Sequence, residues 1–140
     1  MRFWESKRNN IGAILTLVAA VFTFAVVMWP IAVPQGRGYL GTAWGLGAVV
    51  VAIAYLAGFF LADKRWSLAR TVILIAAGIH ILGGLASGFL ADAQELAPAL
   101  SASLFDVAPA VVAIIGGLLI GKPPTPSEYR EMHADDHGRA

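Results

Sequence analysis

The strongest constraint on the fold of this chain is a series of four apolar stretches, each long enough to cross a lipid bilayer. A transmembrane helix needs about 20 consecutive, predominantly apolar residues. The stretches run over about residues 11–33, 40–62, 68–91 and 100–121, and with their short connections they occupy nearly all of the 140 residues. The sequence therefore predicts an all-α protein, a bundle of four transmembrane helices arranged as two helical hairpins.

Two polar segments flank this predicted membrane domain, which spans residues 11–121. Residues 1–10 form a short basic N-terminus, and residues 122–140 form a polar tail in which both charge signs are mixed. The first apolar stretch is longer than the core of a secretory signal, which is roughly 7 to 15 residues, so we interpret it as an uncleaved first span. Because 58% of the residues are hydrophobic and 14% are charged, lipid is the expected solvent.

The positions of lysine and arginine predict the orientation of the spans. Basic residues gather before the first span, at the second connection and after the fourth span, whereas the third connection carries Asp92 and Glu95 and no basic residue. Only Arg37 lies on the opposite side. The positive-inside rule therefore places both termini and the middle connection in the cytoplasm (N-in/C-in), with the protein in the plasma (inner) membrane. The basic residues are Arg2, Lys7, Arg8, Lys64, Arg65, Arg70, Lys122, Arg130 and Arg139.

The composition also excludes several classes of function. The chain has no cysteine, which excludes disulfides, thiolate metal sites and cysteine nucleophiles. A net charge of +1 without an extended basic patch argues against nucleic-acid binding. His133 and His137 have a spacing that could bind a metal if the tail were helical, but a solvated tail is the favoured interpretation and no metal site is predicted. No catalytic arrangement is visible, so the sequence favours a protein that is not an enzyme.

Small residues recur at four-residue spacing along three of the spans. In lipid, close backbone approach over small residues is a main source of helix association. The favoured interpretation is packing inside the bundle; the alternative is that some of these faces bind a partner subunit or a second copy. The predicted packing positions are Gly41 and Gly45, Gly84 and Gly88, and Gly117 and Gly121.

His80 and Asp106 are the two ionisable candidates within the spans. An ionisable residue at the depth of His80 is a functional candidate, and Ala76 and Gly84 share its helix face. The favoured interpretation is a neutral histidine hydrogen-bonded to a neighbouring helix. Proton handling is one alternative, and a pigment or haem ligand is another, because Ala76-x-x-x-His80 resembles the Ala-x-x-x-His pattern of light-harvesting peptides. Asp106 differs in depth from His80 by about one helical turn, so a pair between them is a further alternative.

Two tripeptides near the outer ends of the first and third spans allow one comparison of layout. They are Met28-Trp29-Pro30 and Ser87-Gly88-Phe89. In this layout the chain resembles the SPW-repeat group of small bacterial membrane proteins, whose hairpins carry a Ser-Pro-Trp motif at that place. The resemblance covers about Phe3 to Ile120 and implies the two-hairpin plan, without a defined activity or functional residues.

These patterns together predict a non-enzymatic small integral membrane protein that acts through helix-helix contacts. It would serve as an accessory subunit of a membrane complex or as a homo-oligomer, with the lipid bilayer, other membrane subunits or further copies as partners and no cofactor. The alternative is an intramembrane protein that handles a cofactor, a proton or a small solute at His80, with or without Asp106.

Overall fold

The computed structural model describes residues 2–32, 39–91 and 96–137, and within these ranges the chain forms helices and no strands. The all-α fold class is therefore confirmed. Two short helices flank four long ones. The helices are α1 (Arg2–Glu5), α2 (Lys7–Ala32), α3 (Tyr39–Leu61), α4 (Trp66–Ala91), α5 (Leu96–Leu119) and α6 (Pro126–His137).

The bounds of the long helices differ from the predicted spans by a few residues. α2 begins at Lys7, within the segment expected to be a polar N-terminus, because Ser6 caps it by accepting a hydrogen bond from the Asn9 N–H at 3.5 Å. α5 begins at Leu96, four residues before the predicted start. Pro98 falls in its first turn, where proline is tolerated because the N–H it lacks would have no helical partner.

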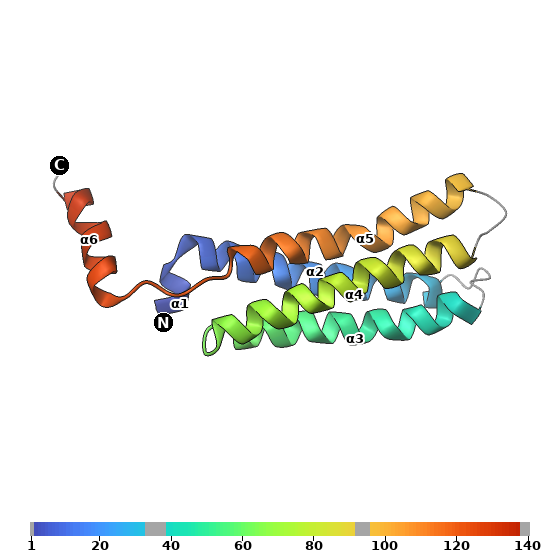
Figure 1. Ribbon diagram of the computed structural model, residues 1–140, viewed down its shortest axis with the longest axis horizontal. Coiled ribbons are helices and arrows are strands. Elements are labelled where there is room, and N and C mark those ends of the chain that lie inside the picture. Colours follow the sequence, from blue (N-terminus) through green and yellow to red (C-terminus); the bar gives the residue numbers. More distant parts are fainter. Residues whose placement is uncertain (1, 33–38, 92–95, 138–140) are drawn as a thin grey trace.

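The long helices form a closed ring in which each runs antiparallel to the next (Figure 1). α2 packs on α3, α3 on α4 and α4 on α5, and α5 returns to pack on α2. This order gathers the start of α2, the turn between α3 and α4, and the end of α5 at one end of the bundle (Figure 1). We call it the basal end.

The bundle has a small-residue interior and a large-residue exterior. Of the sixteen buried hydrophobic residues that the structure describes, eleven are alanines, whereas eighteen large hydrophobic side chains are exposed. A soluble bundle would place its large aliphatic side chains inside. Two helical stretches, Lys7–Val26 and Trp66–Ala86, are also long and apolar enough to cross a membrane. The exposed set includes Ile14, Val18, Val50, Ile53, Ile75, Ile79, Leu82, Val111 and Ile115.

α1 covers part of the basal end. Phe3 is buried and belongs to the same core cluster as Ile120, which lies just after α5. The Trp4 ring packs against Phe59 of α3 with 5.8 Å between the ring centroids. The basic N-terminus is therefore packed against the bundle through its aromatic side chains.

α6 is a twelve-residue helix in the segment predicted as a polar tail. It starts with a capping box, in which Thr125 donates to Glu128 Oε2 from its N–H (2.7 Å) and its hydroxyl (2.8 Å), and the Glu128 N–H donates back to Thr125 Oγ1 at 3.4 Å. Pro126 occupies the first helical position, which suits its fixed φ. Figure 1 shows α6 projecting away from the bundle.

The capping box makes the stability of α6 depend on pH. Hydrogen bonds from Thr125 lower the pKa of Glu128 below its usual value of 4.5, so the stabilisation is fully present above that value and is lost as the pH falls through the lower, folded pKa. We expect Glu128→Gln to reduce hydrogen-exchange protection in the first turn of α6 and to remove this pH dependence. Thr125→Ala should destabilise the helix by about 1 kcal/mol.

Glu131→Gln is the matched control, because it removes the same charge from α6 outside the capping box. If Glu131→Gln lowers protection as much as Glu128→Gln, the effect comes from helix charge in general and the box is not responsible.

Candidate functional site

His80 lies inside the bundle on α4. Its side chain is 2% exposed, and Ala76 and Gly84, one turn before and after it, are also buried. This stripe therefore faces the neighbouring helices, because residues four apart share one helix face.

Tyr55 of α3 is a hydrogen-bond partner of His80. The Tyr55 hydroxyl lies 3.1 Å from His80 Nδ1, both side chains are buried, and the ring centroids are 6.0 Å apart. This hydrogen bond between two buried side chains links the antiparallel neighbours α3 and α4. This is the link to a neighbouring helix favoured for His80 by the sequence.

The antiparallel arrangement explains how these two residues meet. Leu61 ends α3 and Trp66 begins α4, so both lie at the basal turn. Tyr55 is six residues from this turn and His80 is fourteen, and the difference of eight residues places their backbones about 12 Å apart in depth. Side chains tilt toward the N-terminus of their own helix. In an antiparallel pair the two side chains therefore tilt toward each other, and the long phenol spans most of the offset.

Tyr55 was not among the site residues predicted from the sequence. It lies within the second apolar stretch, between Ala54 and Leu56, and so has no polar neighbour in sequence. A hydroxyl in the middle of an apolar run was the available signal, because a buried tyrosine usually finds a hydrogen-bond partner.

Asp106 lies on α5, and its side chain is outside the described residues. The pair between His80 and Asp106 therefore stays a prediction. Among the residues that are described, no group of three His, Cys, Asp or Glu side chains could hold a metal ion. A haem or pigment would reach the enclosed imidazole only if α4 moved away from its neighbours.

In the hydrogen bond between Tyr55 and His80, either side chain can be the donor and the other the acceptor. A phenol is both a donor and an acceptor, and the role of Nδ1 depends on the imidazole tautomer. The two atoms are at hydrogen-bond distance, so a proton can pass between oxygen and nitrogen over one bond. The arrangement is therefore suited to proton handling as well as to joining two helices.

A second buried polar site joins α2 to the end of α5. The Asn9 side chain, 2% exposed, donates from Nδ2 to the Gly121 carbonyl at 3.3 Å and accepts from the Gly121 N–H at 3.0 Å. Arg8 Nη2 donates to the Leu118 carbonyl at 3.1 Å. These two side chains satisfy carbonyl groups that a helix C-terminus leaves without helical partners.

Asn9 begins a buried polar stripe on α2. Thr16 and Thr23 follow at seven-residue spacing, and both are buried. Their hydroxyls donate to the carbonyls of Gly12 (2.9 Å) and Ala19 (2.7 Å), one turn earlier in the same helix. The stripe therefore brings polar side chains into the interior without leaving their donors unsatisfied.

Glycines bring the backbones of neighbouring helices into contact. A Cβ atom on Gly12 would lie 2.7 Å from the Gly116 carbonyl oxygen, and one on Gly116 would lie 2.8 Å from the Gly12 oxygen. A Cβ atom on Gly58 would overlap the side chain of Ile73, and one on Gly117 would lie 3.1 Å from Ile73 Cγ2. Gly12 and Gly116 were not among the predicted packing positions.

The predicted packing glycines have different surroundings. Gly84 is buried in α4 and Gly117 faces α4, as a packing role requires. Gly121 differs from the prediction, because α5 ends at Leu119 and no heavy atom lies within 4 Å of a Cβ at Gly121. Its contact is the pair of hydrogen bonds between its own backbone and the Asn9 side chain. Three further positions lie in α3 and α4 with their surroundings outside the described residues: Gly41, Gly45 and Gly88.

Fold and site together describe a helical bundle with an alanine-rich interior, helix seams built on glycine and a buried phenol–imidazole pair. No protein-family model, curated protein sequence or solved structure matches this chain. The SPW-repeat layout therefore stays a proposal.

Proposed function

We propose that this protein is a four-span protein of the plasma (inner) membrane that acts without catalysis through helix-helix contacts, as an accessory subunit of a membrane complex or as a homo-oligomer. The observation that carries the proposal is Gly78, an exposed glycine in the middle of α4 with open space where a Cβ would stand.

Helix length and the distribution of side chains support four spans. α3 and α5 contain 23 and 24 residues, or about 35 Å of helix, and the hydrocarbon core of a bilayer is about 30 Å thick. Large apolar side chains are exposed on all four long helices. In water this exterior would favour aggregation, whereas in lipid it is the expected surface of a stable bundle.

The charge of the basal end supports a cytoplasmic location for both termini. The described residues there include seven lysines and arginines and only two carboxylates, Glu5 and Asp63. Because cytoplasmic connections carry an excess of lysine and arginine, we place the basal end inside. The cations are Arg2, Lys7, Arg8, Lys64, Arg65, Arg70 and Lys122.

Single cysteines test this topology directly, because the chain has none of its own. Cysteine at Lys64 or Ser127 should react with a membrane-impermeant maleimide only after the cells are broken, whereas cysteine at Gln35 should react in intact cells. Labelling of Lys64→Cys in intact cells would contradict the N-in/C-in orientation. Failure of all three to react after denaturation would show only that the reagent had not worked, so each sample includes a denatured control.

Gly78 differs from the other helical glycines whose surroundings are described. Gly12, Gly58, Gly116 and Gly117 each press against a neighbouring helix, whereas no heavy atom lies within 4 Å of the Cβ position of Gly78. Glycine inside a helix is less favourable than alanine by roughly 0.5 to 1 kcal/mol. Packing within the monomer therefore gives no reason for glycine at this position.

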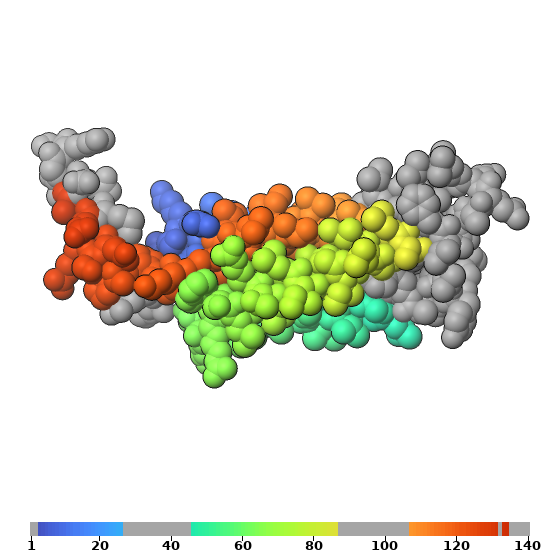
Figure 2. Space-filling view, in the orientation of Figure 1, coloured from blue at the N-terminus to red at the C-terminus, as the bar shows by residue number. Residues whose placement is uncertain are grey.

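The surroundings of Gly78 suit an approaching helix. Ile75, Ile79 and Leu82 are exposed beside it on α4, so a small notch lies between large apolar side chains. A small residue at such a place lets two helix backbones approach closely in lipid. Figure 2 shows that α4 lies along an open face of the bundle, where a second membrane helix could reach it.

We expect Gly78→Leu to abolish association in membranes and Gly78→Ala to weaken it, because both fill the notch. Association is measured by disulfide cross-linking through Ile75→Cys, and the mass of the product separates a homodimer from a complex with another subunit. Ala57→Leu is the matched control, since Ala57 is a small exposed residue on α3.

The proposal is contradicted if Gly78 faces only lipid and binds no partner helix. In that case Gly78→Ala would leave cross-linking unchanged and would stabilise the protein by roughly 0.5 to 1 kcal/mol, the ordinary gain from replacing a helical glycine.

The Tyr55–His80 pair favours a second proposal, that the bundle handles protons at His80, with or without Asp106. The supporting observation is a hydrogen bond of 3.1 Å between two buried side chains in the middle of the bundle. Ionisable side chains at such depth in a membrane commonly belong to proton relays.

Under this second proposal, Tyr55→Phe abolishes proton uptake by vesicles containing the protein, because the phenylalanine ring fills the same space without a hydroxyl. Uptake is followed with an internal pH-sensitive dye under an applied potential. Tyr129→Phe, on the exposed helix α6, should behave as the wild type. If Tyr55→Phe lowers thermal stability by about 1 kcal/mol, as expected for one lost hydrogen bond, and leaves uptake unchanged, the pair has a structural role only.

A further inference from the structure

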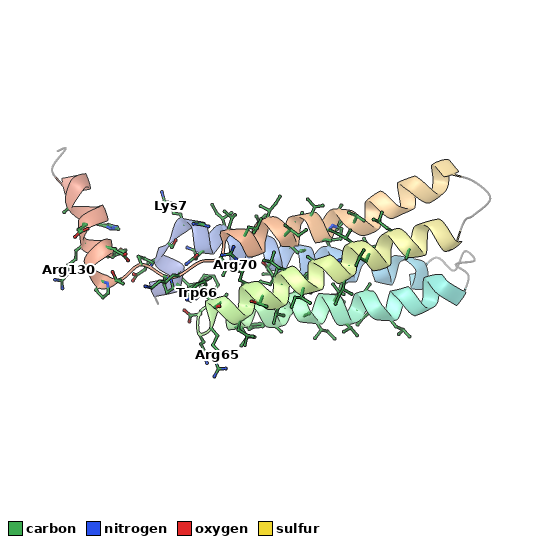
Figure 3. All side chains as sticks on the ribbon, in the orientation of Figure 1. Lys7, Arg65, Trp66, Arg70 and Arg130 are labelled. Carbon is green, nitrogen blue, oxygen red and sulfur yellow. The ribbon has the colours of Figure 1, made fainter. Side chains whose placement is uncertain are left out.

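The basal end combines exposed cations with exposed apolar side chains. Lys64 and Arg65 are exposed in the turn before α4, and Phe60 and Leu68, on either side of this turn, are 72% and 44% exposed. Figure 3 shows Lys7, Arg65, Trp66 and Arg70 at the same end of the molecule, with Arg130 apart from them on α6. Charge and apolar surface therefore meet at one level of the bundle.

Trp66 and Arg70 are one helical turn apart on α4, so they share a face. Both side chains are partly buried. The contact of Gly117 with Ile73 and Leu74 fixes the register of α5 against α4. Because the helices are antiparallel, Arg70 is level with the chain just beyond the end of α5.

One of the basal cations already has a partner within the chain, because Arg8 donates to the Leu118 carbonyl. The cations nearest along the chain to the exposed Phe60 and Leu68 are Lys64, Arg65 and Arg70. These three are therefore the best placed to meet an external anion that carries acyl chains.

We propose that Arg70 and Trp66, with Lys64 and Arg65, form a binding surface for the headgroup of an anionic phospholipid. A guanidinium binds phosphate oxygens through two parallel hydrogen bonds. An indole ring is favoured at headgroup depth, and Phe60 and Leu68 offer apolar surface to the acyl chains. A soluble anion such as a nucleic acid would have no use for these exposed apolar side chains.

This inference rests on the membrane placement proposed above and is independent of contacts at Gly78. The test uses the full chain in detergent micelles, titrated with phosphatidylglycerol or with phosphatidylcholine of the same acyl chains, with bound lipid counted by native mass spectrometry. We expect the wild type to prefer phosphatidylglycerol. Arg70→Gln should weaken phosphatidylglycerol binding about fivefold, the effect of one basic residue near an anionic surface, and leave phosphatidylcholine binding unchanged.

Arg130→Gln is the matched control, because it removes the same charge from α6 and should leave the preference intact. Arg65→Gln is the second variant: Arg65 is exposed, so its replacement should weaken binding without any risk to the fold. Arg70→Lys, which keeps the charge and loses the two-pronged contact, should fall between the wild type and Arg70→Gln.

Three outcomes would overturn the inference. The wild type could bind both lipids equally, Arg70→Gln and Arg130→Gln could weaken binding alike, or soluble glycerol phosphate could displace the lipid as readily as free phosphatidylglycerol does. Gly78→Leu should keep the lipid preference, so a failure of the association proposal can be told apart from a failure of this one.

Discussion

The contact between α2 and α5 is the constraint on which the rest of the bundle depends, because it closes the ring of four helices. At Gly12 and Gly116 no side chain separates the two backbones. Helices in lipid gain little from the hydrophobic effect, so packing and hydrogen bonds must hold them together. Close approach supplies the packing, and the Asn9 amide, which pairs with both backbone groups of Gly121, supplies hydrogen bonds at the basal end.

Because the four helices pack closely, mainly small side chains fit between them. Alanine fills most of the interior, and most of the large aliphatic side chains point outward, where lipid would accept them in the proposed membrane placement. Tyr55 and His80 are large polar exceptions, and the Tyr55 hydroxyl lies at hydrogen-bond distance from His80 Nδ1. Burying the Tyr55 hydroxyl without this partner would leave a polar group unsatisfied. The pair is therefore consistent with the fold whether or not it also moves protons.

Local pattern predicted the helices well, because a long apolar run has few alternatives in a membrane protein. Contacts between residues far apart in the sequence were harder to predict. Asn9 and Gly121 are 112 residues apart, and nothing near either one indicates the other. Gly12 was overlooked because Thr16 one turn later is not glycine, although threonine is also small enough for a helix seam. The full length of α6 was not predicted, because a polar composition concealed the capping pattern of Thr125 and Glu128.

An exterior made of isoleucine, leucine and valine offers the same apolar surface to any lipid or helix. Specific recognition must therefore come from positions where the exposed residue is not a large aliphatic one. Gly78 is one such position, and the basal cations are others. Counted from Trp66, Gly78 lies twelve residues along α4 and Arg70 four, so the two are about 12 Å apart in depth. In the proposed membrane placement, one position lies among acyl chains and the other at the headgroups. A partner helix and an anionic headgroup can therefore occupy the same helix together, each recognised by the chemistry of its own depth.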